Sequence, residues 1–158
     1  MRKRLGIVAV AVAALLVVAV GASLVSASSG LTSPKTLTFT AKQTQFHFLD
    51  NNPTGNSVGD ELAFTETLTK GGKHIGFDGV HCVVTGIKPT ETECVGTISF
   101  TDGSKLAAQT LFHPKNGPQT IPLAITGGSG IYQNAGGFGT IKSTSQTTST
   151  YTLHVIVP

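Results

Sequence analysis

Arginine is absent from the chain beyond residue 4, and lysine and acidic residues balance there at eight each. The only arginines, Arg2 and Arg4, flank Lys3, so the net positive charge of the whole chain comes from its N-terminus. A chain otherwise close to neutral lacks the basic surface that is typical of proteins that bind nucleic acids or anionic membranes. The composition therefore gives no support for either kind of partner.

Long hydrophobic runs are absent apart from one, at residues 5–20, which consists almost entirely of Ala, Val, Leu and Ile. It follows the basic residues and precedes the small residues 25–27, an arrangement typical of a secretory signal peptide. We therefore expect cleavage near Ala27 and a secreted, extracellular protein that leaves the membrane after cleavage. An uncleaved N-terminal anchor is the alternative, because the apolar run is only just short of a comfortable membrane span.

Cysteine is scarce, with only Cys82 and Cys94 in the chain. In an exported protein, two cysteines predict a disulfide before a metal site or a reactive thiol. Counting from a turn centred on Lys88 places them opposite each other on neighbouring strands, as a cross-strand disulfide requires. A nucleophilic cysteine with a histidine partner is the competing interpretation, and a disulfide would exclude it.

Motifs for several other chemistries are missing. There is no arrangement of Ser, His and an acid with a nucleophile elbow, and no carboxylate pair whose spacing alone indicates a glycosidase. The histidines show no pair at metal-ligand spacing on one element, so we expect no metal and no cofactor. They lie at positions 47, 74, 81, 113 and 154.

Glycine, in contrast, is abundant between residues 125 and 140, where it surrounds Tyr132 and Phe138. A dinucleotide-binding fingerprint that starts at Gly128 would need glycine at position 133, which is Gln133, and a phosphate-binding loop would need Gly-Lys followed by Ser or Thr. Both patterns fail. The segment is better explained as a tight turn, because glycine adopts positive φ at little cost.

Alternating hydrophobic and polar residues predict an all-β domain over residues 37–158, after a flexible leader at residues 28–36. Eight strands without a convincing helix favour a closed antiparallel barrel. The expected strands cover residues 37–48, 61–69, 74–86, 92–101, 105–112, 120–126, 137–145 and 149–157.

The glycine segment carries a resemblance to a known family. Residues 127–137, Gly-Gly-Ser-Gly-Ile-Tyr-Gln-Asn-Ala-Gly-Gly, resemble the glycine signature shared by dirigent proteins and allene oxide cyclase-like barrels. The motifs at residues 57–60, 71–76 and 94–98 resemble elements of exported bacterial members. The likeness covers nearly all of residues 37–157.

This resemblance implies an eight-stranded antiparallel barrel whose cavity opens at one end. Plant members cyclise an unstable epoxide of an oxidised fatty acid or guide the coupling of phenolic intermediates, mainly by confining a reactive substrate in an apolar cavity. The family's dirigent pockets use acidic residues with a Tyr and often an Arg, which this domain lacks. Relatives often form dimers or trimers, and the oligomeric state of this chain stays open.

Three polar residues are candidates for catalysis. Glu66 lies on the apolar face of its strand, and Asp50 follows an aromatic pair, so either acid could transfer protons if burial raised its pKa. Asp50 could instead cap its loop, and Glu66 would face solvent if the pleat ran the other way. Tyr132 is the third candidate, with ordinary core packing as the alternative.

Phe64 and Phe138 are expected at the ligand pocket. The sequence thus favours a secreted barrel that binds a small, apolar, oxygenated molecule and guides its cyclisation or isomerisation. A secreted binding or surface barrel without catalysis is the alternative, and whether the protein is an enzyme stays open.

Overall fold

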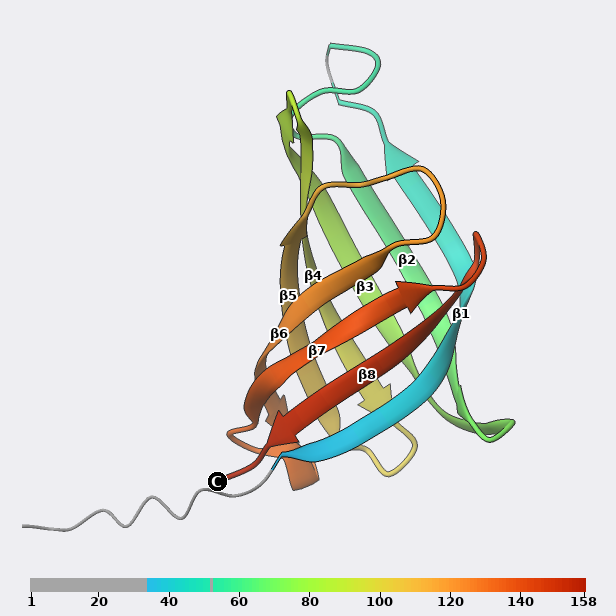
Figure 1. Ribbon diagram of the computed structural model, residues 1–158, viewed down its shortest axis with the longest axis vertical. Helices are drawn as coiled ribbons and strands as arrows, with labels where there is room; N and C mark the ends of the chain where they lie inside the picture. Colours follow the sequence, from blue (N-terminus) through green and yellow to red (C-terminus); the bar gives the residue numbers. More distant parts are fainter. Residues whose placement is uncertain (1–33, 52) are drawn as a thin grey trace, which may run out of the picture. The chain divides into compact units, whose positions relative to one another are not determined.

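The computed structural model describes residues 34–51 and 53–158, which form a closed antiparallel barrel (Figure 1). Each strand pairs with its sequence neighbours, and β1 pairs with β8 to close the barrel. The all-β prediction of eight strands is confirmed. The strands are β1 (Lys35–Leu49), β2 (Glu61–Lys70), β3 (Lys73–Ile87), β4 (Thr90–Phe100), β5 (Lys105–Phe112), β6 (Thr120–Ser129), β7 (Gly136–Ser143) and β8 (Thr148–Ile156).

The expected signal peptide at residues 1–27 and most of the leader lie outside the described residues. β1 already begins at Lys35, so the last two leader positions belong to the barrel. None of the helices among the described residues has the length and apolar character needed to cross a membrane. The one helical element there is a single 3₁₀ turn, η1 (Gly130–Tyr132), in the glycine segment between β6 and β7.

The apolar face of each strand points into the barrel, as the alternation predicts. Towards the end that carries η1 and both ends of the described chain, these side chains fill the interior. Phe39 is stacked on Tyr151 with ring centroids 5.2 Å apart, and Phe100 packs against Tyr132. The buried cluster comprises Phe39, Ala41, Leu68, Ile98, Leu106, Leu123, Ile125, Tyr132, Ala135, Tyr151, Leu153 and Val155.

The barrel closes fully over only part of its length. β1 pairs with β8 through residues 35–42, whereas residues 45–49 pair with β2 alone. On the other side, β5 pairs with β6 only through residues 105–109. The upper parts of β1 to β5 therefore extend beyond the closed section (Figure 1), and the barrel opens at that end.

A bulge at Ile75 and Gly76 sets the register of β2 and β3. Below it Thr69 pairs with His74, whereas above it Leu68 pairs with Gly76, so β3 gains one residue. Because side chains alternate with period two, the extra residue exchanges the faces of all later β3 positions. Gly76 has φ of 153°, and a Cβ there would overlap the carbonyl oxygen of Ser99.

Two features fix the open end. Cys82 and Cys94 form the predicted disulfide between β3 and β4. Asp60 is fully buried at the start of β2 and accepts hydrogen bonds from the Ser57 backbone N–H at 2.8 Å and from the Asn51 backbone N–H at 3.0 Å. These contacts hold the β1–β2 connection together, and backbone hydrogen bonds from Gly59 N–H to the Val84 carbonyl at 2.9 Å and from Val84 N–H to the Asp60 carbonyl at 2.8 Å join it to β3.

Candidate functional site

Besides a hollow of about 300 Å³ at the β5–β6 and β7–β8 connections, two concave regions formed by the strands are large enough to hold a small molecule. One is an internal cavity of about 310 Å³ at the open end of the barrel. The other is a groove of about 800 Å³ on the outer surface. They differ in enclosure and in chemistry, and these differences decide which is the candidate site.

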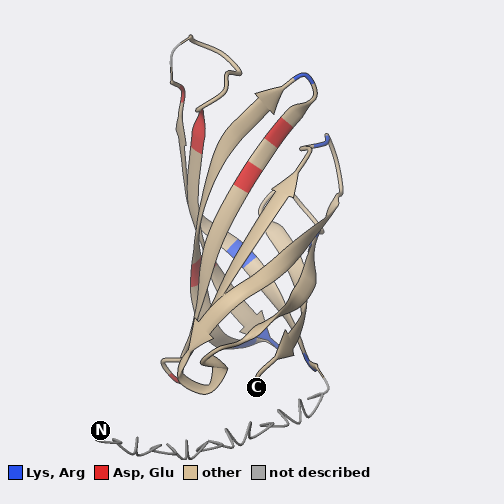
Figure 2. Ribbon diagram, turned by 90° about the vertical axis from the view of Figure 1, so that its left-hand side faces the viewer, with Lys and Arg blue, Asp and Glu red and all other residues tan. Residues whose placement is uncertain are grey.

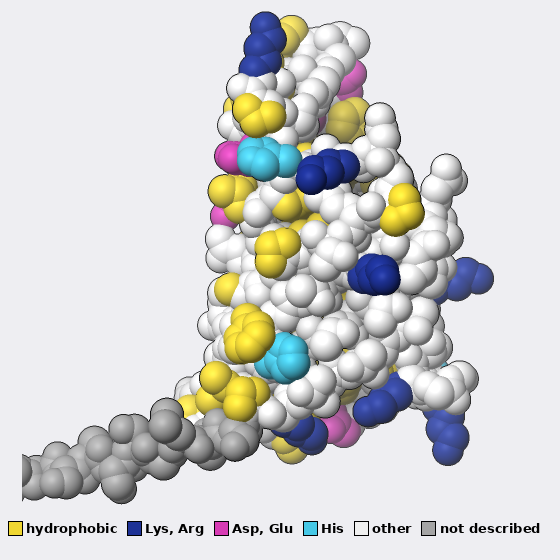
Figure 3. All heavy atoms as spheres, in the orientation of Figure 1, with side chains coloured by type: hydrophobic (Ala, Val, Ile, Leu, Met, Phe, Trp, Pro, Cys, Tyr) yellow, Lys and Arg dark blue, Asp and Glu magenta, His cyan; other side chains and the backbone are white. Residues whose placement is uncertain are grey.

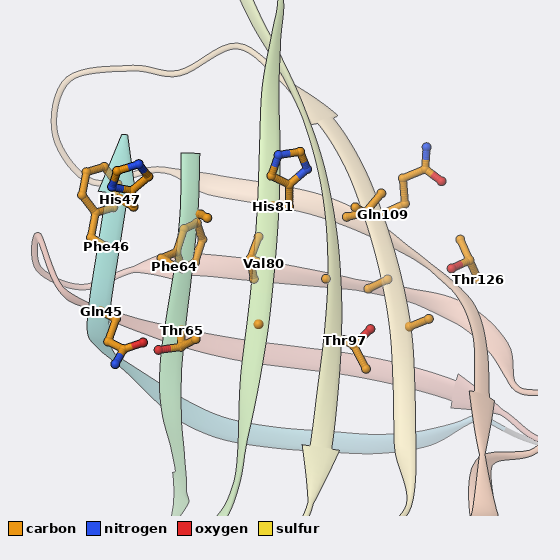
Figure 4. Close-up of a pocket in the computed structure, with 16 residues that line it drawn as sticks. Gln45, Phe46, His47, Phe64, Thr65, Val80, His81, Thr97, Gln109 and Thr126 are labelled. Atoms are coloured by element: carbon orange, nitrogen blue, oxygen red, sulfur yellow. The ribbon is translucent and has the colours of Figure 1, made fainter. Parts of the chain in front are cut away.

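The outer groove crosses the outside of β1 to β6, and its lining includes small residues such as Gly79 and Ala107. Figure 4 shows it with larger lining residues labelled. Its ionisable side chains, His47 and His81, are exposed to solvent. His81 pairs with Glu61 at 2.9 Å, also at the surface. The groove therefore lacks the buried polar groups that usually mark a catalytic pocket.

The internal cavity is enclosed by residues of all eight strands and by the connections at the open end. Its wall is mostly apolar and includes Phe64, Phe112, Ile141 and the Cys82–Cys94 disulfide. Pro114 and Gln146, in the β5–β6 and β7–β8 connections, border its mouth. A cavity of this size and lining is typical of a site for a small organic molecule.

Glu66 and Tyr151 are the polar groups at the inner end of this cavity. Glu66 on β2 is 6% exposed, and Tyr151 on β8 is 4% exposed. The Tyr151 hydroxyl donates a hydrogen bond of 2.8 Å to Oε2 of Glu66. Because this bond crosses the barrel interior, it fixes both side chains at the cavity wall.

Asp78 lies directly opposite Glu66 on β3 and is 1% exposed. It borders a deeper pocket of about 40 Å³, which shares Val80, Cys94 and Tyr151 with the cavity above. Within the described part of the chain, neither carboxylate oxygen of Asp78 has a hydrogen-bond partner. A buried polar group without a partner is rare and costly, which makes Asp78 the most informative group in the barrel.

Burial and mutual repulsion set the protonation of this pair. Burial, followed by the charge on Glu66, raises the pKa of Asp78 to about 8. Burial also raises the pKa of Glu66, although the hydrogen bond from Tyr151 opposes that rise. Burial and the two neighbouring carboxylates raise the pKa of Tyr151, so its hydroxyl keeps its proton. Near neutral pH, Asp78 therefore holds a proton, and Glu66 is the carboxylate stabilised by Tyr151.

This arrangement can both donate and accept a proton at one place. Two carboxyl groups with separated protonation states are a common basis for acid and base catalysis. Tyr151 orients Glu66 and supplies a second hydroxyl at the cavity wall. Among residues 34–51 and 53–158, no group of three or more His, Cys, Asp or Glu side chains could hold a metal ion.

The three candidate catalytic residues do not come together. Glu66 lies at the cavity, as described. Asp50 is exposed, and its carboxylate accepts hydrogen bonds from the Gly55 backbone N–H at 3.1 and 3.2 Å, which caps the β1–β2 connection. Tyr132 is buried in the filled end of the barrel against Phe100. Their positions leave Glu66 as the one candidate at the cavity wall.

The two expected pocket aromatics also separate. Phe64 faces the cavity. Phe138 is 56% exposed on the outer face of β7, where its ring lies against His154 with centroids 4.8 Å apart. β7 directs Gly139 and Ile141 inwards instead, because Phe138 occupies the alternate position.

Two residues of the site, Asp78 and Tyr151, are not among the candidates that the sequence predicts. Tyr151 stands in an alternating strand, where its inward position could be inferred, but its partner lies 85 residues away. Asp78 reaches the interior only because of the bulge at Gly76. A glycine two residues before an acid, within a strand that follows a short turn, is the available signal.

Comparisons with known proteins agree with this architecture. The profile of the allene oxide cyclase barrel like domain matches residues 35–157. Among solved structures, a pyocyanin demethylase is 32% identical over 77% of this chain and 100% of its own, with a TM-score of 0.69. No curated protein matches the chain.

Two further structures share the fold at lower identity. A pterocarpan synthase dirigent protein is 19% identical, with 77% of this chain and 83% of its own covered and a TM-score of 0.64. A Diels-Alderase from Streptomyces koyangensis is 14% identical, with 78% and 64% covered and a TM-score of 0.62. Barrels of this architecture thus occur in proteins named for quite different reactions.

Proposed function

The chain belongs to the allene oxide cyclase barrel-like family, and on this premise we propose that its barrel binds a small, largely apolar, oxygenated molecule and guides its cyclisation or isomerisation. The observation that carries the proposal is Asp78, a buried carboxyl group without a partner beneath an apolar cavity. A bound molecule with a polar group at this depth would supply the missing hydrogen bond.

Asp78 and Glu66 together can move a proton within the ligand, so that the ligand isomerises and its atomic composition does not change. Asp78 donates its proton to an oxygen of the ligand, while Glu66 accepts one from another position. The proton then passes from Glu66 to Asp78 across the two opposed strands, which restores the starting state. The apolar wall confines the ligand in one folded conformation and lowers the entropic part of the barrier.

A second candidate reaction follows from the relative at 32% identity, which is a pyocyanin demethylase. Pyocyanin is therefore the first compound to test, both as a ligand and as a substrate. If the protein demethylates pyocyanin, the same cavity would hold it, because the outer groove lacks buried ionisable groups. A barrel that binds its ligand without catalysis is the remaining alternative.

We also propose that the protein is exported. The support is the signal-like layout of residues 1–27 and the Cys82–Cys94 disulfide, since disulfides persist mainly in oxidising compartments. N-terminal sequencing of the protein isolated from culture medium would test the expected cleavage near Ala27.

The binding test uses an introduced tryptophan, because the chain contains none. In Phe112→Trp the indole reports from the cavity wall, and in Phe46→Trp it reports from the outer groove. We expect pyocyanin to change the emission of Phe112→Trp with saturation and to leave Phe46→Trp without a saturable change. The reverse pattern, or no saturable change in either variant, would contradict binding in the cavity.

The catalytic test compares product formation in Asp78→Asn and Glu66→Gln with that in Asp50→Asn. Native mass spectrometry of the protein isolated from its own host identifies a co-purified molecule, which then serves as substrate beside pyocyanin. We expect both cavity variants to lose at least about 100-fold in turnover, within the range for general acid–base groups, and Asp50→Asn to keep it. Binding without turnover by the unaltered protein would support the non-catalytic alternative.

A further inference from the structure

We infer that the cavity selects its ligand by charge, accepting neutral or cationic molecules and rejecting carboxylates and other anions. This inference rests on the proposed binding function and adds the chemical class of the ligand. It depends on which charged groups face the cavity and which do not.

The cavity and the deeper pocket contain only two ionisable groups that can carry a charge near neutral pH, Glu66 and Asp78. Both are acidic, and no Lys, Arg or His lines either space within the described part of the chain. Tyr151, the third polar group, donates a hydrogen bond from its hydroxyl to Glu66 and stays neutral.

The positive groups are all elsewhere. All eight lysines of the described chain are exposed. Figure 2 marks lysine positions on the ribbon, and Figure 3 shows lysine side chains that project from one face of the molecule. His47, His74, His81 and His113 are also exposed, and His154 lies on the outer face against Phe138. None of these cations lines the cavity, so none can neutralise an anion there.

An anionic ligand would thus lose its hydration in an apolar space and meet the carboxylate of Glu66 in place of a counter-charge. Transfer of an unpaired charge into such surroundings is strongly unfavourable. A neutral ester or ketone avoids this cost, and its carbonyl oxygen can accept a hydrogen bond from the protonated Asp78. A cation gains from the carboxylate of Glu66, and its N–H groups can fill the empty acceptor positions of Asp78.

The acidic pair alone would not define a site. The second observation is that Asp78 is almost completely buried, has no hydrogen-bond partner in the described chain and borders the pocket beneath the cavity. Glu66 is already oriented by Tyr151 at the entrance to that pocket. The geometry therefore presents acceptor oxygens to whatever enters and presents no fixed positive charge.

The test uses three probes that share a naphthalene ring and differ in charge: methyl 2-naphthoate, 2-naphthoate and protonated 2-(aminomethyl)naphthalene. Isothermal titration calorimetry at pH 7 measures their affinity for the full chain. We expect the ester and the ammonium probe to bind at least about tenfold more tightly than the carboxylate, a difference of about 1.4 kcal/mol. Glu66→Gln and the double variant Glu66→Gln, Asp78→Asn should reduce that ratio, because Glu66 carries the negative charge at pH 7, and Asp50→Asn should leave it unchanged.

The outcomes separate the two proposals. If 2-naphthoate binds as tightly as its ester, the charge selection is wrong, although the cavity still binds ligands. If none of the three probes binds, the cavity is not a site for molecules of this size, and the proposed function fails as well. Circular dichroism of each variant confirms folding, and the single variant Glu66→Gln decides the question should the double variant not fold.

Discussion

Glu66 and Asp78 are cross-strand partners with both carboxyl groups buried inside the barrel. Like charges directly opposite each other on one face of a sheet are destabilising, and burial adds to the cost of ionising both. The hydroxyl of Tyr151 donates its hydrogen bond to Glu66. Tyr151 also lowers the pKa of Asp78, but burial and the charge on Glu66 outweigh that effect. Because the Glu66 carboxylate is stabilised more than that of Asp78, Asp78 is the protonated member of the pair.

Stability should fall as the pH rises from about 4 to about 8. The pKa of Asp78 is raised from 3.8 in the unfolded chain to about 8 in the folded protein, so the folded state binds more protons throughout this interval. Stability therefore decreases with pH there, and the raised pKa of Glu66 acts in the same direction. Thermal unfolding followed by circular dichroism should show this decline in the unaltered protein and a flatter profile in Asp78→Asn.

Asp50→Asn is the control for that experiment, because the Asp50 carboxyl is exposed. Its pH profile should follow that of the unaltered protein. A melting temperature that rises with pH between 4 and 8, or an equal slope in Asp78→Asn, would contradict the assignment of the proton to Asp78.

Removal of the Tyr151 hydroxyl should destabilise the barrel. Tyr151→Phe leaves Oε2 of Glu66 buried without its donor, and an unsatisfied buried acceptor costs about 1–3 kcal/mol. Urea denaturation at pH 7 measures the change. Tyr132→Phe, at the filled end of the barrel, is the matched control and should cost less. Equal losses in the two variants would show that the Tyr151 hydrogen bond has no special weight.

Gly76→Ala should destabilise far more than Gly79→Ala on the same strand. A Cβ at Gly76 would overlap the Ser99 carbonyl oxygen and would have to adopt φ of 153°, whereas a Cβ at Gly79 meets nothing within 4 Å. We expect a loss of at least about 2 kcal/mol for Gly76→Ala, from steric overlap and backbone strain together. Urea denaturation of both variants provides the comparison, and similar midpoints would mean that the bulge tolerates a side chain.

These residues also show what could be read from the sequence. Alternation predicts the eight strands because each has one buried and one exposed face, and turn counting places Cys82 opposite Cys94. The same counting fails for Asp78. The two-residue turn at Gly71 and Gly72, continued without a bulge, would pair Glu66 with Phe77 and direct Asp78 outwards, because one inserted residue reverses the alternation.

The remaining differences have a similar origin in long-range geometry. The glycine segment makes Tyr132 a candidate from the sequence, but η1 directs that residue into the filled end of the barrel. Tyr151 becomes the functional partner of Glu66 only when β8 closes against β1 and brings it across the interior. Local pattern indicates which face a side chain occupies unless a bulge exchanges the faces, as it does for Asp78, and the closure of the barrel determines which residues that side chain contacts.

Reduction of the disulfide should lower the unfolding free energy by about 3 kcal/mol, the value expected for a loop closed between cysteines 12 residues apart. Urea denaturation with and without a reducing agent measures the loss. The double variant Cys82→Ala, Cys94→Ala should not respond to the reducing agent. A reduced protein as stable as the oxidised one would show that the cross-link contributes little to the barrel.

The central claim is that Asp78 holds a proton at the inner end of a ligand cavity. Its most direct test is a side-chain carboxyl ¹³C NMR titration of protein labelled at its four aspartates, with Asp78 assigned from Asp78→Asn. The account predicts that Asp78 titrates at about 8 and that this midpoint shifts when methyl 2-naphthoate is added. A midpoint near the ordinary value of about 4, unchanged by the probe, would contradict it.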